Sequence, residues 1–336
     1  MKKSNFNLFM LSGALLLVAN SANAATIYDN NISALNINML SDVFMSYTSH
    51  GEKMSDLFGK RDIYGTMNRY DEYGDDGSTL KTFEDSATNN QSVLNTVWIN
   101  ANHINEHLHY GQNVSEHGRF NLATVGMTTQ AINLAYGKIS FGGFASYINT
   151  KMPDFHGNGD AVGLFANYKY RGFGIKALAD IGSLNNNADG MDFNNSWVNV
   201  ATDINTLFRI EPTFLFRPNV SVAYTYVSSD DLFIGGNTIS SKDYNFFNIA
   251  PGVAFIKEIS LNWYGSLSAK YVAHFGGKND INIGNNAIRG LYLDNHTDIG
   301  IDIEHNFKHL ILGANVHKQV GALDGWSTNI NLKYAF

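Results

Sequence analysis

The chain has 336 residues, of which 44% are hydrophobic and 13% aromatic, and its 23 basic and 30 acidic residues give a net charge of −7. The absence of cysteine excludes a disulfide scaffold and thiol chemistry. The acidic balance argues against nucleic acid as a partner, because affinity for nucleic acid depends on clustered basic side chains.

The amino terminus has the features of a secretory signal peptide. Two lysines precede an apolar core over residues 8–18, and Ala22 and Ala24 supply the small side chains that a signal peptidase requires. We therefore predict a signal peptide over residues 1–24. The apolar core is too short for a membrane-spanning helix, and no later run of about eighteen apolar residues exists. We expect an exported protein without a helical anchor.

Residues 25–91 are expected to form a short amino-terminal segment. Apolar residues recur at spacings of three and four from Ile32 to Tyr47, which predicts one amphipathic helix over residues 33–48. Residues 59–90 are polar, acidic and glycine-bearing, so they cannot bury much apolar surface. We expect them to form a flexible linker.

From residue 92 to residue 336 the chain alternates between apolar and polar residues. The pattern is clearest where Ile299, Ile301 and Ile303 alternate with polar or small residues. Segments of about ten residues with this period are typical of strands that face lipid on one side and water on the other. Twelve segments have the pattern: 95–104, 119–129, 137–149, 159–170, 172–183, 195–208, 214–227, 244–256, 260–274, 293–304, 309–318 and 326–336.

The connections between these segments alternate in length. Short connections include Arg171 alone and residues 306–308. The long connections are 105–118, 150–158, 184–194, 228–243, 275–292 and 319–325. Outer-membrane barrels have short periplasmic turns and long outer loops. We therefore predict an all-β fold, a 12-stranded antiparallel transmembrane β-barrel, with a short N-terminal helix in or near its pore.

The last eleven residues form an alternating strand with aromatic residues at both ends, and the chain stops on Phe336. This end resembles the end of Gram-negative outer-membrane proteins. The resemblance implies a signal for the barrel-assembly machinery, with outer-membrane lipid and periplasmic chaperones as further partners. The residues of this signal would be Trp326, Ile330, Leu332, Tyr334 and Phe336.

A helix, a Trp-bearing first strand at 95–100 and eleven further strands resemble the translocator domain of autotransporters, the type V secretion family. Three stretches, 142–147, 214–224 and 325–336, look most like barrels of the vacuolating-cytotoxin type. The resemblance implies an outer-membrane location in a Gram-negative bacterium. It also implies that the barrel anchors, and exports, its own N-terminal segment to the pore or the cell surface.

In that family the helix before the first strand lies in the pore, so residues 33–48 are the candidate plug. Its polar face would meet charged residues on the polar side of the strands, although these could equally be solvated charges without a partner. The helix could instead form a small surface domain. The candidate lumen residues are Lys169, Lys176, Asp203, Lys270, Asp298, Asp302, Glu304 and Lys333.

Some autotransporters cut themselves at an Asn-Asn pair inside the pore, and this chain has such pairs at 30–31 and 89–90. Because asparagine is abundant throughout, pairs are also expected by chance.

Histidines crowd the first strand end, where alternate residues could hold zinc or nickel. A polar surface loop is the favoured interpretation, and we predict no cofactor. The residues concerned are His103, Glu106, His107, His109, Glu116 and His117.

A hydrolase site on the outer rim is a further alternative, because several acidic and histidine residues fall in the long connections. Nothing in the sequence fixes them relative to one another, so we predict that the protein is not an enzyme. The residues concerned are Asp154, His156, Asp160, Asp230, Asp231, His274 and Asp280. The remaining alternative is a stand-alone pore, or an adhesin whose loops at 228–243 and 275–292 bind an unknown host or surface ligand.

Overall fold

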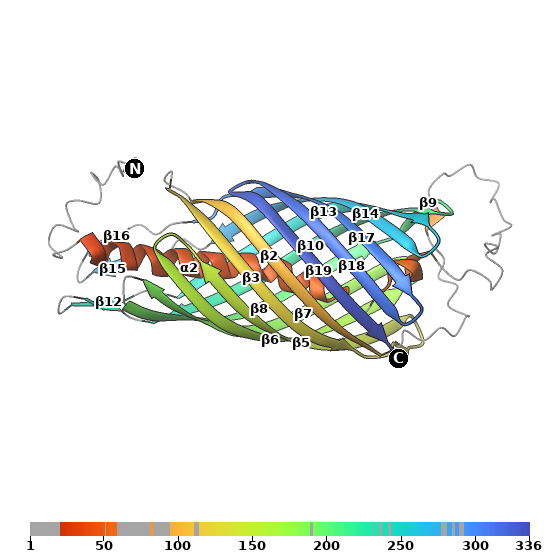
Figure 1. Cartoon of the computed structure of the whole chain (residues 1–336), viewed down its shortest axis with the longest axis horizontal. Helices are drawn as coiled ribbons and strands as arrows, with labels where there is room; N and C mark the ends of the chain where they lie inside the picture. The colour runs from red at the N-terminus through yellow and green to blue at the C-terminus, as the bar shows by residue number, and fades with distance from the viewer. Residues whose placement is uncertain are drawn as a thin grey trace.

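The computed structural model is dominated by one closed sheet with a helix along its interior (Figure 1). Side chains of the helix are described from Ile32 onward. The residues that the structure describes are 21–50, 52–58, 81–82, 95–110, 114–188, 191–230, 232–234, 237–240, 243–276, 281–283, 286–288 and 292–336.

Twelve long antiparallel strands form the barrel, so the predicted fold class is confirmed. The barrel closes because the last long strand pairs with the first, for example Leu332 with Ile99. Closure leaves no barrel edge unpaired, which is what a sheet in lipid requires. The strands are β2 (Thr96–Tyr110), β3 (Val114–Thr128), β5 (Lys138–Lys151), β6 (Phe155–Tyr170), β7 (Phe173–Ala188), β8 (Met191–Thr206), β10 (Phe214–Ser229), β13 (Tyr244–Ser260), β14 (Trp263–Gly276), β17 (His296–Phe307), β18 (Leu310–Gly321) and β19 (Leu323–Ala335).

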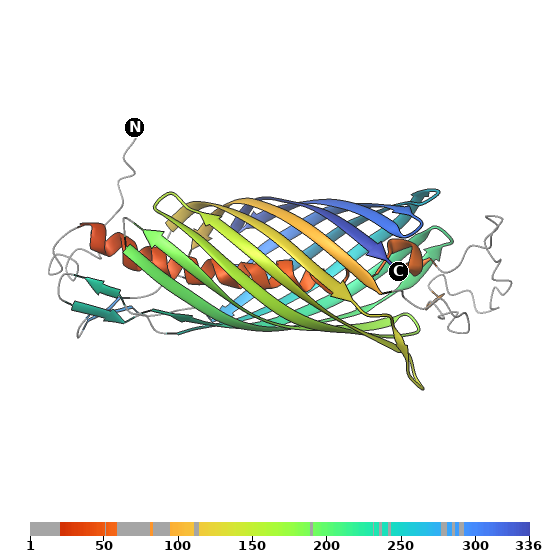
Figure 2. The ribbon, with the colours of Figure 1, turned by 60° about the horizontal axis from the view of Figure 1, so that its bottom comes forward.

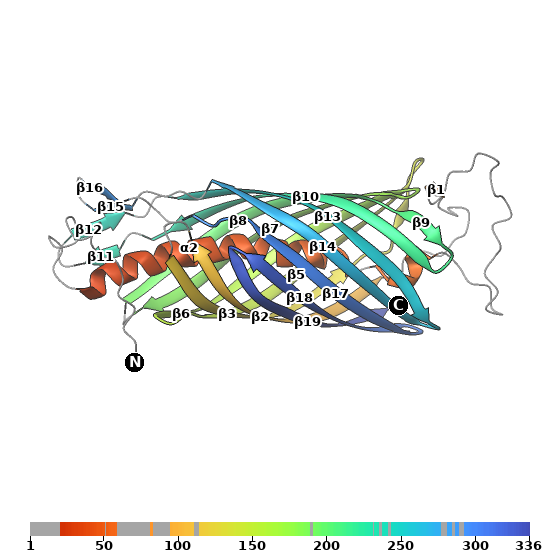
Figure 3. The same ribbon diagram turned by 90° about the horizontal axis from the view of Figure 1, so that it is seen from above.

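Short strands lie at the two ends of the barrel. The end that carries Thr96 and Ala335 is called the inner rim here, and the opposite end the outer rim. At the inner rim lie β1 (Lys81–Thr82), β4 (Ile132–Asn133) and β9 (Phe208–Glu211). Beyond the outer rim, a separate four-stranded sheet contains β11 (Leu232–Ile234), β12 (Asn237–Ser240), β15 (Ile281–Ile283) and β16 (Asn286–Ile288) (Figure 3).

Four of the six predicted long connections are wrong, because the strands continue into them. Residues 105–118, for example, contribute ladder pairs such as His107 with His117. These extensions carry polar residues on the outward face, so hydropathy does not distinguish them from loops. The same correction applies to 150–158, 184–194 and 319–325. In the connections at 228–243 and 275–292 only the first two residues belong to barrel strands, β10 and β14, and the described remainder contains the small sheet.

The outward side of the barrel is apolar, as lipid requires. Ile301 is 64% exposed and Leu164 is 73% exposed, whereas Asp298 on the other face of β17 is buried. In β19 the exposed series contains Trp326, Ile330, Leu332 and Tyr334, followed by Phe336.

The helix α2 (Ser21–Tyr47) runs lengthwise inside the barrel (Figure 2). It begins twelve residues before the predicted start at residue 33, because helix-favouring residues such as Ala22 and Ala24 extend it where the apolar period is absent. It ends at Tyr47, where 3₁₀-type bonds tighten the chain, and the short helix η1 (Met54–Leu57) follows. None of the helices in the described part of the chain is long and apolar enough to cross a lipid bilayer.

Candidate functional site in the barrel lumen

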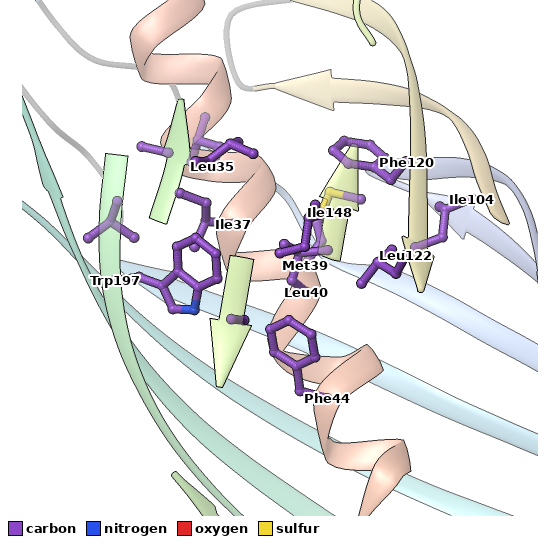
Figure 4. Close-up of a cluster of buried hydrophobic side chains, with 14 of the residues drawn as sticks. Leu35, Ile37, Met39, Leu40, Phe44, Ile104, Phe120, Leu122, Ile148 and Trp197 are labelled. Atoms are coloured by element: carbon purple, nitrogen blue, oxygen red, sulfur yellow. The ribbon is translucent and has the colours of Figure 1, made fainter. Parts of the chain in front are cut away.

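The lumen has an apolar half, formed mainly by β2, β3 and β5–β8, and α2 packs against it. Figure 4 shows Leu35, Leu40 and Phe44 of the helix among wall side chains such as Ile148 and Trp197. All of them are buried. Burying one such side chain stabilises the packed state by about 1.5–3 kcal/mol, so the apolar contacts of α2 contribute on the order of 10 kcal/mol as an upper limit.

The expectation that the inner face of every strand is polar is therefore wrong for this half. Large aromatic rings face inward here because the helix covers them and shields them from water. At the inner end of α2, the Tyr47 ring lies 5.5 Å from the Trp98 ring and 5.2 Å from the Phe144 ring, measured between centroids. The Tyr47 hydroxyl accepts hydrogen bonds from Asn102 at 2.9 Å and from Thr124 at 3.0 Å. Both kinds of contact fix the register of α2 along the lumen.

Cross-strand glycines make room for these rings. A Cβ on Gly126 would lie 2.1 Å from Trp98 Cζ2, and a Cβ on Gly182 would lie 2.2 Å from Trp197 Cζ2. The two indoles can thus lie flat on the wall and leave space for the helix.

We expect Gly126→Ala to lower the free energy of unfolding by about 1–3 kcal/mol, because the new methyl group displaces the Trp98 ring into the plug. Urea unfolding of the purified barrel measures the change. Gly265→Ala is the matched control, since its nearest neighbour is the flexible end of Ile259 at 2.9 Å. Equal unfolding curves for the two variants would contradict this role of Gly126.

The other half of the lumen is polar and contacts α2 through specific hydrogen bonds. Asn248 Nδ2 donates to Asn38 Oδ1 at 2.9 Å, and Asn38 Nδ2 donates back to Asn248 Oδ1 at 3.3 Å. His274 Nδ1 lies 3.2 Å from Asn38 Nδ2. One turn further along the helix, Asp42 forms an ion pair with Lys270 at 3.2 Å.

Residues 48–50 and 52–58, which follow the helix, are bound to the wall at the inner end of the lumen. Asn167 Nδ2 donates to the Thr48 carbonyl at 2.7 Å, and Lys176 Nζ donates to the Ser49 hydroxyl. The Glu52 carboxylate lies 3.2 Å from Lys169 Nζ and 4.0 Å from Lys176 Nζ. Two lysines of neighbouring strands, Lys169 of β6 and Lys176 of β7, therefore hold the segment.

A second set of contacts holds the same segment to β17 and β19. Glu304 accepts a hydrogen bond from the Met54 backbone N–H at 2.7 Å and pairs with Lys333 at 3.1 Å. Lys333 also donates to the Glu52 carbonyl at 3.1 Å. Phe58 then packs in a small apolar cluster that includes Leu215. These contacts close the inner end of the barrel around the plug.

The eight predicted lumen residues differ in what they contact. Lys169, Lys176, Lys270, Glu304 and Lys333 contact the plug directly, as described above. The other three bind wall residues: Asp203 accepts from Asn205 and Asn219 at 2.7 Å and from Ser221 at 2.8 Å, and His317 lies 2.7 Å from Asp298 and 3.8 Å from Asp302.

A cavity of about 290 Å³ remains between the plug and the polar half of the wall. Asp42 and His50 line it from the plug, and Arg217, Asp302 and Lys333 line it from the wall. The helix thus fills the apolar side of the lumen and leaves a polar space on the other side.

The sequence reasoning did not identify the plug residues Asn38, Asp42 and Glu52, or the wall residue Arg217. Arg217 lies on the same face of its strand as the buried Leu215, so the alternation of the following residues could have located it. No periodic signal marks Glu52.

Glu52 should make plug binding sensitive to acid. Burial raises the pKa of its carboxyl, but Lys169, Lys176 and Arg217 outweigh burial and lower the pKa from 4.5 to about 2. Because the folded-state pKa is depressed, this stabilisation is complete above about pH 4.5 and is lost as the pH falls through about 2.

We expect brief conductance openings of the barrel in planar bilayers to become about tenfold more frequent between pH 5 and pH 2.5. Glu52→Gln should show the frequent openings already at neutral pH, with little further change on acidification. A wild-type pH profile retained by Glu52→Gln would contradict this assignment.

The histidine-rich first hairpin does not assemble a metal site in the part that the structure describes. His107 and His117 are cross-strand neighbours with ring centroids 4.8 Å apart, but Glu106 lies on the opposite, buried face of β2. The alternation of an extended strand separates the two residue types.

The candidate hydrolase residues are likewise dispersed. His274 lies in the lumen against Asn248 and His296, whereas Asp154, His156 and Asp160 are exposed outside. Asp231 and Asp280 lie outside the described residues. The Asn pair at 89–90 does as well, as do the side chains of the pair at 30–31 and those of Ala22 and Ala24.

Comparisons with known proteins agree with this arrangement of barrel and internal helix. The family model described as Autotransporter beta-domain matches residues 97–317, more than half of the chain. A search of curated protein sequences finds no significant match.

Three solved structures share the fold. The β-domain of the Bordetella autotransporter Brka has a TM-score of 0.61 at 14% identity, covering 72% of this chain and 100% of that chain. The transport unit of AIDA-I from Escherichia coli has a TM-score of 0.58 at 12% identity, covering 86% and 99%. The translocator domain of NalP from Neisseria meningitidis has a TM-score of 0.55 at 13% identity, covering 74% and 91%.

Proposed function

The chain belongs to the autotransporter β-domain family, and from this premise we propose that its barrel anchors its own N-terminal segment and exports the start of that segment, residues 25–31. The family assignment makes it an outer-membrane β-barrel of a Gram-negative bacterium and a translocator of type V secretion, which is not an enzyme.

The direction of α2 in the lumen carries the proposal. Asn38 contacts Asn248 near the outer start of β13, whereas Tyr47 contacts Trp98 near the inner start of β2. The amino-terminal end of α2 therefore points through the outer rim, toward the small outer sheet (Figure 3). A polypeptide attached to this end would emerge at the cell surface.

Epitope tags test the proposal. A tag inserted after Thr26 should be accessible to antibody and to external protease on intact cells, whereas a tag near Gly77 should become accessible only after permeabilisation. A Thr26 tag that requires permeabilisation would contradict export. A heat-dependent shift in gel mobility, measured for both tagged proteins, shows that the barrel has assembled.

We also propose a finer relationship, to barrels of the vacuolating-cytotoxin type. The stretches 142–147, 214–224 and 325–336 support it, and a family tree of aligned barrel sequences tests it. Clustering with another autotransporter branch would reject the relationship.

The last strand is proposed to serve as the signal for the barrel-assembly machinery, after delivery by periplasmic chaperones. Its outward aromatic residues, Trp326, Tyr334 and Phe336, support this role. We expect deletion of Phe336 to reduce the heat-modifiable, assembled fraction several-fold in cells, whereas Lys308→Gln should not. An unchanged assembled fraction would contradict the role of Phe336.

A second candidate function is ligand binding by the outer connections. The observation that favours it is the small sheet formed by β11, β12, β15 and β16 beyond the outer rim. Deleting residues 232–240 should abolish attachment of cells to a surface ligand if the connections bind it. Attachment that instead depends on residues 25–31 would assign binding to the exported segment.

A further inference from the structure

An uncompensated pair of basic residues lies on the outer wall of the barrel, away from the lumen. Arg119 of β3 and Lys151 of β5 are directly opposite each other in the strand ladder, and both side chains are exposed. Neither has an ion-pair or hydrogen-bond partner among the described residues. Like charges at directly opposed positions destabilise a sheet, so this arrangement lacks an internal explanation.

The immediate neighbours of the pair on the outward face are histidines rather than carboxylates. His156 of β6 is the ladder partner of Lys151 on the other side, and His117 lies two residues from Arg119 on the same face. By contrast, Lys318 on the outward face of β18 pairs with Asp324. In a chain with a net charge of −7, the wall therefore neutralises one exposed cation and leaves two neighbouring cations unpaired.

The position of the pair relates it to the membrane. Four residues nearer the centre of β5, Tyr147 is 50% exposed, as expected for an aromatic residue at a membrane interface. Further along the same outward face, Val125 and Val162 are exposed and apolar. Arg119 and Lys151 thus lie just beyond the apolar band, toward the outer rim, at the level of lipid headgroups.

We infer that Arg119 and Lys151 bind the phosphate groups of the glycolipid that forms the outer leaflet of the outer membrane. Phosphate oxygens accept short, charge-assisted hydrogen bonds from Arg and Lys, and a single phosphate between them cancels their mutual repulsion. The acyl chains of the same lipid would lie on the apolar wall below. The inference rests on the outer-membrane location and does not depend on the proposed export.

Lipid retention by the purified full-length chain in detergent tests the inference, with lipid A carrying two phosphates as the probe and native mass spectrometry as the readout. Arg119→Gln with Lys151→Gln should lower retention about tenfold or more, and so should removal of both lipid phosphates. The matched control is Lys257→Gln with Lys308→Gln, two exposed lysines of the inner rim, which should retain lipid like the wild type. Equal retention by both double variants, or equal retention of phosphatidylglycerol by the wild type, would overturn the inference.

A charge reversal keeps the test independent of any folding defect. Lys151→Glu places a counter-charge beside Arg119, so the thermal unfolding midpoint without lipid should rise above that of the wild type. Added lipid A should raise the midpoint of the wild type and leave that of Lys151→Glu unchanged. A lipid-induced rise of the same size in both proteins would overturn the inference.

Discussion

Removing residues 32–58 should turn the closed barrel into an open channel, with a single-channel conductance about tenfold or more above that of the intact chain. The described residues of this segment, 32–50 and 52–58, fill the apolar half of the lumen and close its inner end through Glu52, Met54 and Phe58. The lumen of a barrel of this size holds one helix and little else, so emptying it leaves a continuous aqueous path.

Planar-bilayer recording measures this effect, and a deletion of equal length over residues 63–89 is the control. The control should keep the low conductance of the intact chain, because residues 32–58 remain. If both deletions left the conductance low, the lumen would be closed by something other than the plug. If both opened it, the effect would come from shortening the chain.

The second large effect is expected from the buried ion pair between Lys333 and Glu304. Their side chains are only 7% and 5% exposed. Lys333→Met leaves the Glu304 carboxylate buried without its cation, which should cost about 3–5 kcal/mol of unfolding free energy. It also removes the hydrogen bond to the Glu52 carbonyl, so the plug should be released more readily.

The double variant Lys333→Met with Glu304→Gln separates charge from packing. Since it leaves no unpaired charge, it should recover most of the stability lost in Lys333→Met. Urea unfolding of the four proteins in the cycle measures the coupling. Additive losses, with the double variant as unstable as the sum of the single variants, would show that the pair does not act through its charges.

The barrel could be predicted from sequence because lipid imposes one uniform requirement on its outer surface. Every second residue of a spanning segment must be apolar, as in Ile299, Ile301 and Ile303, so twelve strands were recognisable without any alignment. The strand ends beyond the lipid are not subject to that requirement. Residues 105–109 and 116–118 are therefore polar on the outward face, and the sequence predicts a loop over 105–118.

The lumen could be predicted only in part. The kind of side chain that each strand needs on its inner face depends on which part of the plug it contacts, and this differs from strand to strand. Trp98 faces the helix and Trp326 faces the lipid, yet both are aromatic residues in alternating segments. The inward lysines can be recognised from sequence because they fall on the polar side of alternating strands. Their partner Glu52 was not, because it lies in an irregular segment whose position depends on the folded barrel.

Cross-linking between α2 and the wall tests most directly the central claim that the helix lies in the lumen with its amino-terminal end outward. The chain has no native cysteine, so Asn38→Cys with Asn248→Cys introduces the only two thiols. Their native side chains are hydrogen-bonded at 2.9 Å, within reach of a short bismaleimide. After cleavage at a protease site inserted near Gly77, cross-linked α2 should remain attached to the barrel on a denaturing gel. The control is Asn38→Cys with Ile330→Cys, in which residue 330 faces lipid, and this protein should release α2 after cleavage. Release of α2 from the protein with cysteines at 38 and 248, or retention of α2 in both proteins, would contradict the account.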